Sequence, residues 1–513
     1  MIIKVKCYFP AENLLLATKN LQDSSGNWQN KIISISSLSR NIGEDKSYEI
    51  SGISIELNDS DRFFRTMMSG DNRYIAGKKV EILDENDTLI YTGNVEKWEF
   101  TEDALSLFIN DRLSGLDTVI PHTLTTEDYP DAADEGVGTS IPIIYGHVQS
   151  VKGAVKCWKV ESGKYLLAGH HCMSLEGVFK EDGTDVSTDF QLSNEGSAAQ
   201  GNEKAYAQYI GQGTFTEDSI HINVKGKMQD SALIEHPMTA LEDIIANYTD
   251  MTLSTLNQEE NQAIMNDRNY IIAAVIHNQK TVKDFLIEFA FSFDCDFYLN
   301  KGNEIVVVLL NWDNLQPEKS LNKKQITNFQ LQELPEAIRN KVKYMYRYNY
   351  AEEKYQRLPL YERSESISNW GEFYNKNEAL ACSCVYDENT AFDVVQRYAF
   401  QRKNPQRIAV VELPLDEFAG LDISDIVEMQ HPGSIDEKKR KYQIRRVNID
   451  FLSDAVQMEC VDITSLAGGI FILGDDSFAD NWEEADDYER QFAYLCDSDG
   501  FFANDIDEGK ILY

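Results

Sequence analysis

The chain has 513 residues, too many for one hydrophobic core, so three or four domains are expected. Its formal net charge of −37 argues against a surface that binds nucleic acid by neutralising phosphates. Such an acidic surface either serves solubility or forms a wall that repels the phosphates of passing DNA. No apolar run reaches the roughly 18 residues that a membrane span requires.

The sequence indicates where the chain is made and whether its cysteines form disulfides. The N-terminal residues have the pattern of a strand and lack the apolar region of a signal peptide, so synthesis in a cytoplasm is expected. The eight cysteines are scattered and contain no CxxC pair. Eight cysteines in a chain of this length do not indicate a disulfide framework, so free and mostly buried thiols are expected.

Residues 1–120 show the two-residue periodicity of half-buried strands. The alternation is clearest in residues 31–38 and 48–57. One hairpin is predicted between residues 77 and 93, and a second between residues 95 and 110. These segments predict a small antiparallel barrel or sandwich as the first domain.

The stretch Ile141–Val148 follows an acidic loop and is rich in Ile and Val, which favour strands. Pro142 stands near its start, where a missing backbone donor does least harm, and Ile141, Tyr145 and Gly146 complete the motif. It is interpreted as the strand where the chain leaves the first domain. A β-rich block with Gly-containing turns follows, so residues 121–233 are predicted to be a linker and a β-rich insert domain.

Helical periodicity begins after Pro237. Residues 239–248 and 281–293 are predicted amphipathic helices, the second with Thr281 as its N-cap. A hairpin turning at Lys301-Gly302 completes a predicted α/β module over residues 234–325. The next domain, residues 326–466, is predicted to contain a helix over residues 389–402 and strands at 407–413, 426–429, 442–449 and 455–461.

Two hairpins of the predicted β domains repeat one pattern. In each, an aromatic residue is followed after two positions by Asp-Ala and then by alternating aliphatic residues. The landmarks are Phe100, Asp103 and Ala104 in the first copy and Phe451, Asp454 and Ala455 in the second. The repeat predicts two copies of one fold in the chain, so a trimer would present six similar units in a ring.

Residues 467–513 form an acidic tail with interleaved aromatic residues. Disordered tails usually contain fewer aromatics, which favours docking on a surface, although a disordered acidic tail is the alternative. The candidate docking residues are Trp482, Tyr494, Leu495, Phe501 and Phe502. The Asp-rich run after Asp497 has its glycine too early for an EF-hand.

Catalytic and metal-binding motifs are missing from the sequence. It contains no P-loop, GxSxG or HExxH motif and no paired Cys/His metal spacing. His170-His171 is interpreted as an exposed or packed pair in preference to a metal site, which needs more ligands. No catalytic, cofactor or metal residue is therefore predicted, and the protein is not expected to be an enzyme.

The chain resembles the tail hub proteins of tailed bacteriophages, also called baseplate hub or tail-tip proteins. The most specific motif is residues 139–148, and further motifs lie at residues 52–58, 71–74, 340–344 and 424–428. The resemblance implies a mainly β fold with α+β modules, in which two tube-like antiparallel β-barrel domains carry inserted β-rich and α/β domains. These motifs are structural, and a fused lysozyme or peptidase domain, found in some members, is not visible.

The same resemblance implies a homotrimer that closes the distal end of the tail tube. Its implied partners are a tail tube or distal tail protein, the tape-measure protein, and spike, fibre or tip proteins. DNA would pass through without specific binding, and the chain would not insert into a membrane. The implied location is the distal tail of the virion, after assembly in the host cytoplasm. A cell-wall or polysaccharide hydrolase at the tail tip and a receptor-binding or fibre-attachment adaptor are the alternatives.

Overall fold

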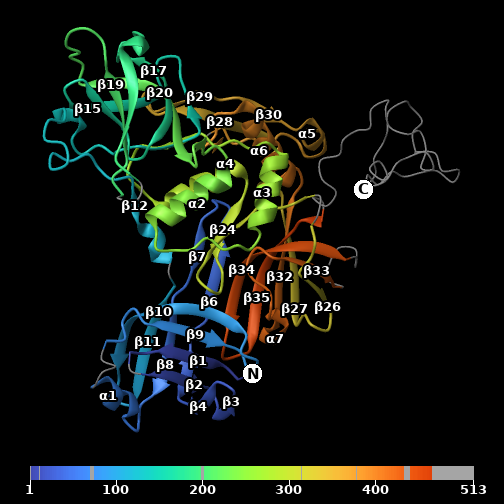
Figure 1. Ribbon diagram of the computed structural model, residues 1–513. Coiled ribbons are helices and arrows are strands. Elements are labelled where there is room, and N and C mark those ends of the chain that lie inside the picture. The colour runs from blue at the N-terminus through green and yellow to red at the C-terminus, as the bar shows by residue number, and fades with distance from the viewer. Residues whose placement is uncertain are drawn as a thin grey trace.

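The computed structural model describes residues 2–464, except residues 11, 70–73, 112, 198–200, 313–314, 377 and 432–438. Most of the regular structure is β. Figure 1 shows a blue N-terminal sheet at the bottom, an orange-red sheet beside and above it, and the helices and the green β-rich part on top. No helix in the described part of the chain is long and apolar enough to cross a membrane.

The first sheet has nine strands and is built from residues 4–110. Its neighbouring strands run antiparallel, except that β2 and β4 are parallel. In spatial order the strands are β3 (Leu21–Asp23), β4 (Gly26–Asn30), β2 (Asn13–Ala17), β1 (Lys4–Tyr8), β9 (Lys79–Leu83), β10 (Leu89–Phe100), β11 (Ala104–Asn110), β8 (Ile53–Asn58) and β5 (Ile32–Ile35). The short helix α1 (Phe63–Met68) connects β8 to β9.

The second sheet is built from residues 319–462 and receives a hairpin from the N-terminal part of the chain. Its order is β26 (Lys319–Asn322), β33 (Ile426–Gln430), β34 (Arg440–Asp450), β35 (Ala455–Asp462), β32 (Gln406–Pro414) and β27 (Asn328–Leu334), with α7 (Leu415–Phe418) after β32. The hairpin is β6 (Leu38–Ile42) and β7 (Tyr48–Ile50), and β6 pairs antiparallel with β34.

The two sheets repeat one topology. The order β9-β10-β11-β8-β5 in the first matches β33-β34-β35-β32-β27 in the second, and all neighbours within both sets are antiparallel. The chain visits the matching strands in the same sequence order. The next strand beyond each matched set of five differs in direction. In the first sheet β1 is antiparallel to β9, whereas in the second sheet β26 is parallel to β33. This repeat agrees with the pattern found at the two hairpins.

The hairpin landmarks correspond only in part. Ala104 and Ala455 both begin the returning strand. Phe100, however, is the last residue of β10 and faces Leu105, whereas Phe451 lies in a longer turn and is buried. The two aromatic residues are therefore not structurally equivalent, because the second turn contains more residues than the first.

One hydrophobic core joins the two sheets. It contains Ile55 and Leu107 of the first sheet and Val411 and Met458 of the second, all fully buried. The hairpin β6–β7 crosses between them. Each sheet has two ends, and no strand pairing among the described residues joins them into a closed barrel.

The β-rich insert has its own sheet and core. Its strands are β14 (His147–Val148), β15 (Val155–Glu161), β16 (Lys164–Ala168), β17 (Cys172–Phe179), β18 (Phe190–Glu195), β19 (Lys204–Tyr209), β20 (Ser219–Gln229) and β21 (Ala232–Leu233). The long strand β20 pairs with β14, β15, β17 and β21 and so organises the sheet. A separate cluster of buried side chains lies beneath it.

The helical part packs around α4 (Val282–Phe293), with α2 (Pro237–Tyr248), α3 (Gln258–Asp267) and the hairpin β24 (Asp296–Leu299) and β25 (Ile305–Val308). Thr281 is the N-cap of α4 and forms a capping box with Asp284, as its sequence position predicts. Two small ladders, β12 (Val119–Ile120) with β23 (Lys280–Thr281) and β13 (Ile143–Tyr145) with β22 (Ala274–Ile276), attach this part to preceding segments.

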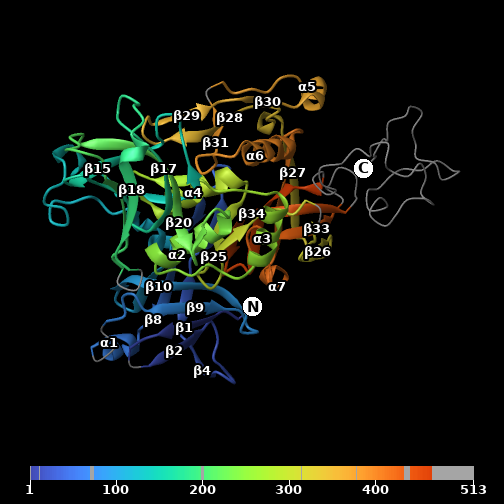
Figure 2. The same cartoon turned by 45° about the horizontal axis from the view of Figure 1, so that its top comes forward.

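The chain between β27 and β32 packs largely with this helical part, although its Phe400 also reaches Ile426 and Val461 of the second sheet. It contains β28 (Lys341–Asn349), β29 (Lys354–Arg357), β30 (Leu360–Glu362), α5 (Ser364–Trp370), β31 (Ala379–Ala381) and α6 (Glu388–Gln401). Val342 and Val394 share the cluster that contains Phe289 of α4. Figure 2 shows these elements at the top, above α4. The expected domain over residues 326–466 is thus interrupted by a long insertion.

Candidate functional site

A strongly charged buried site lies where the hairpin β6–β7 meets β24 and β34. Asp296 is buried and forms ion pairs with Arg445 and, at 3.3 Å, with Lys46. Lys46 also lies 3.5 Å from Asp294. Burial alone would raise the pKa of Asp296, but the cations of Arg445 and Lys46 hold it well below its usual range. The cluster therefore connects three parts of the fold through charges that water does not screen.

Arg40 of β6 is a second anchor in the same joint. Its guanidinium is buried and donates to a carboxylate oxygen of Asp422 and to the main-chain carbonyl of Leu299. It also donates to Tyr48 Oη at 3.0 Å. A planar guanidinium with several fixed donors suits such a position, since each donor must find a partner when it is buried. These contacts fix the hairpin against β24 and against the loop that precedes β33.

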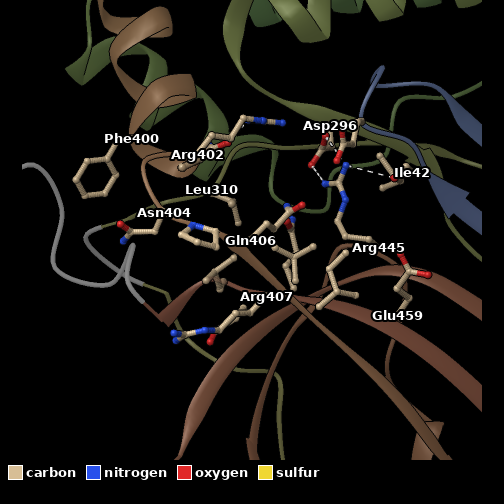
Figure 3. Close-up of a pocket in the computed structure, with 18 of the residues that line it drawn as sticks. Ile42, Asp296, Leu310, Phe400, Arg402, Asn404, Gln406, Arg407, Arg445 and Glu459 are labelled. Atoms are coloured by element: carbon tan, nitrogen blue, oxygen red, sulfur yellow. Dashed lines mark hydrogen bonds and ion pairs between the residues drawn. The ribbon is translucent and has the colours of Figure 1, made fainter. Parts of the chain in front are cut away.

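A cavity of about 410 Å³ opens beside this joint (Figure 3). Its wall includes Ile42, Leu310, Phe400 and Arg407. Several of its charges are already paired. Arg407 Nε lies 3.0 Å from Glu333, Arg440 lies 3.1 Å from Asp462, and Arg445 contacts Asp296. The arrangement stabilises a junction between sheets, and we find in it no nucleophile–base pair among the described residues.

The stretch Ile141–Val148 lies elsewhere, between the insert and the helical part. Its first half pairs with β22 and its second half with β20. Gly146 separates the two with a φ of +66°, and a Cβ there would lie 2.0 Å from the Ile272 carbonyl oxygen. The motif thus joins two modules that are both distant in sequence from the first sheet, which the chain leaves after β11.

Buried polar contacts fix this motif. Tyr145 donates to Asp243 Oδ2 at 2.5 Å, and Lys227 binds the same oxygen at 2.7 Å. The carbonyl of Pro142 accepts from the Gly169 amide at 3.2 Å, and Ile141 is buried nearby in a small cluster under the insert. The residues that the sequence motif singled out therefore serve packing between modules.

His170 also belongs to this region. Its Nε2 accepts the amide of Ile144 at 2.9 Å, so its Nδ1 carries the proton and donates to the carbonyl of His171 at 3.0 Å. Burial lowers its pKa to about 4, which keeps the ring neutral. His170 is thus packed, whereas His171 is half-buried with its Nδ1 3.3 Å from Glu203. No group of three metal-ligating side chains occurs in the described part of the chain.

The remaining candidates are not brought together. Phe100, Asp103 and Ala104 lie at the β10–β11 turn, and Phe451, Asp454 and Ala455 lie at the β34–β35 turn. The tail candidates Trp482, Tyr494, Leu495, Phe501 and Phe502 lie outside the described residues.

Sequence reasoning missed the anchors of the joint. Arg40 faces inward between Leu38 and Ile42, which are both buried in the same strand. A charged residue at an inward position of an alternating strand was the available signal, because such a charge requires a buried partner. The partner itself lies in a segment far along the chain and could not be read from the pattern.

The chain was compared with known proteins. No family model and no curated protein matches it. Among solved structures, it is similar to the 43 kDa tail protein of prophage MuSo2 from Shewanella oneidensis. That match has 9% identity and a TM-score of 0.40, and it covers 90% of this chain and 98% of that one. A prophage tail protein from Listeria monocytogenes matches with 9% identity, coverages of 90% and 95%, and a TM-score of 0.40.

A tail protein from Neisseria meningitidis matches with 7% identity, coverages of 90% and 95%, and a TM-score of 0.37. All three neighbours are tail proteins, and those from Shewanella oneidensis and Listeria monocytogenes are prophage proteins. The resemblance carried by the sequence motifs names the same class.

Proposed function

We propose that this chain is a structural protein of a phage tail, a homotrimeric hub at the distal end of the tail tube. The observation that carries the proposal is the repeated sheet, β9-β10-β11-β8-β5 and β33-β34-β35-β32-β27, within one chain. Three copies would place six similar sheets around an axis, which allows a threefold object to meet a sixfold tube. The sequence resemblance to tail hubs supports the same assignment.

The joint between the two sheets supports a mechanical role. Buried charges of Arg40, Asp296 and Arg445 hold the hairpin β6–β7, the second sheet and the helical part in one orientation. A hub must transmit load from the tube to the tip without its modules shifting, and buried paired charges fix geometry in this way. The insert and the helical part stand on one side of the two sheets (Figure 1) and are proposed to face the tip proteins.

The net charge of −37 is consistent with a channel for DNA. An acidic wall repels phosphates, so DNA could pass the ring without being held. The proposed protein partners are the tail tube protein, the tape-measure protein and the tip proteins. No bond is made or broken by the chain.

The proposal is tested on virions that contain this chain. Mass spectrometry of purified particles should detect it, and gold-labelled antibodies should mark the tail end distal to the capsid. A label on the capsid, or absence of the chain from purified particles, contradicts the proposal.

A further inference from the structure

The joint inside the chain shows how one sheet receives a strand from another. The first half of β34 pairs with β33, and the second half pairs on the same edge with β6. In this pairing Leu38 lies opposite Ile449 and Arg40 lies opposite Val447. Val447 and Ile449 are consequently buried, with 1% and 2% of their surfaces exposed.

The equivalent edge of the first sheet is open among the described residues. The first half of β10 pairs with β9, and the contact ends at Val95, whose amide donates to the Lys78 carbonyl and whose carbonyl accepts from the Gly77 amide. Trp98 of β10 pairs with Leu107 of β11, and Val447 of β34 pairs with Met458 of β35. Because these strands correspond in the two sheets, Trp98 is the counterpart of Val447. Yet Trp98 is 39% exposed. Within the described ranges, no strand pairs with residues 97–100 on that edge.

The strand that corresponds to β6 also has an open edge. Ile35 of β5 pairs with Ile55 of β8, and Phe329 of β27 pairs with Val411 of β32. Ile35 and Phe329 therefore occupy equivalent positions. Five residues further along the chain, Arg40 pairs with Ile50, and Leu334 pairs with Gln406. Arg40 and Leu334 are therefore equivalent as well. The residues Gln332–Leu334 of β27 therefore correspond to Leu38–Arg40, which follow β5 in the first half of the chain. β27 is the last strand of its sheet, with β32 as its one neighbour among the described residues.

We propose that β27 of one copy pairs antiparallel with residues 97–100 of β10 in the next copy. The occupant of the open edge is thus a second copy of this chain, and the contact repeats the joint between β6 and β34. Leu334 lies opposite Trp98, and Glu333 lies opposite Glu99. This inference rests on the proposed homotrimer and names the surfaces that close it.

The proposed pairs fit their positions in two ways. Trp98 and Leu334 remove apolar surface from water, and cross-strand pairs of an aromatic with an aliphatic residue stabilise sheets. Pro335 would lie opposite Lys97 at the end of the ladder, where a missing amide donor costs least.

The opposed carboxylates Glu99 and Glu333 disfavour the contact. Each has a cation nearby that reduces the repulsion, because Lys97 lies 3.5 Å from Glu99 and Arg407 lies 3.0 Å from Glu333.

A disulfide tests the register directly. Directly opposed residues of antiparallel strands have Cβ atoms about 4.5–5.5 Å apart, close enough for a disulfide after small adjustments. The full chain carrying both Glu99→Cys and Glu333→Cys, with Cys496→Ser to remove a native thiol, is oxidised at micromolar concentration. The seven cysteines in the described part of the chain are buried, so they do not compete.

The expected result is a ladder of monomer, dimer and trimer on a non-reducing gel from the double variant. Each single variant should give at most dimers, at least tenfold less abundant. A trimer in solution without cross-linking of the double variant overturns this joint and leaves the proposed function standing. A monomer that does not cross-link overturns the joint as well, and virion labelling then decides the function separately.

A second pair of variants keeps the test independent of disulfide chemistry. Trp98→Asp should raise the dissociation constant of the trimer at least tenfold, because a carboxylate would be buried against Leu334. Leu360→Asp is the matched control, since Leu360 is 45% exposed and lies in β30, away from both edges. Equal affinities for Trp98→Asp and the control contradict the proposal. Circular dichroism verifies that both variants fold.

Discussion

Asp296 carries the strongest residue-scale prediction. Asp296→Asn leaves the buried Arg445 without its carboxylate and Lys46 with Asp294 as its remaining partner, and we expect a loss of about 3–5 kcal/mol of stability. Because the pKa of Asp296 is lowered in the folded state, its contribution is present above the unfolded pKa of about 3.9 and is lost as pH falls below it. Urea unfolding measures the change. Asp61→Asn, in an exposed pair with Lys31, should cost far less stability than Asp296→Asn, and equal losses would contradict the account.

Asp425 should behave in the opposite way. Burial and the neighbouring Asp422 carboxylate raise the pKa of Asp425 to about 7, although the Asp422 amide donates to it at 2.6 Å. A raised pKa means that stability falls as pH rises from about 4 to about 7. Asp425→Asn should therefore raise the free energy of unfolding, measured with urea, more at pH 8 than at pH 4, by about 4 kcal/mol. The exposed Asp103→Asn serves as control, and a pH-independent effect of Asp425→Asn would contradict the assignment.

At the scale of elements, Gly146 allows β13 and β14 to join different sheets. Gly146→Ala introduces a Cβ 2.0 Å from the Ile272 carbonyl oxygen in addition to its positive φ, so we expect a loss of about 3 kcal/mol or more. Gly213 has a φ of +85° with no atom within 4 Å of the added Cβ. Gly213→Ala thus isolates the cost of the backbone conformation and should cost about 1 kcal/mol. Thermal unfolding compares the two, and equal effects would show that the close contact relaxes.

The elements also show what the sequence could predict. Local signals located α4 with its Thr281 cap and the hairpin at Lys301-Gly302, because caps and turns depend on neighbouring residues. The register of β6 against β34 could not be predicted, since it joins residues about four hundred positions apart. The aromatic landmarks Phe100 and Phe451 matched in sequence but not in structure, because a change in turn length leaves the flanking strand patterns unaltered.

At the scale of the whole molecule, the repeated sheet was predictable and the shared core was not. The alternation around Ala104 and Ala455 reflects the same burial in two places, so a repeat of topology could be inferred from it. Alternation gives no information on which sheet a buried face meets. The first and second sheets therefore share one core that the sequence pattern assigned to two separate domains.

The central claim is that three copies of this chain form a ring in which its two similar sheets alternate. Electron microscopy of the purified full-length oligomer, reconstructed without imposed symmetry, tests it most directly. The account predicts three copies around an open centre, with six similar sheets and with β27 of each copy beside β10 of the next. A monomer, a dimer, or a trimer whose sheets do not form a ring would contradict it.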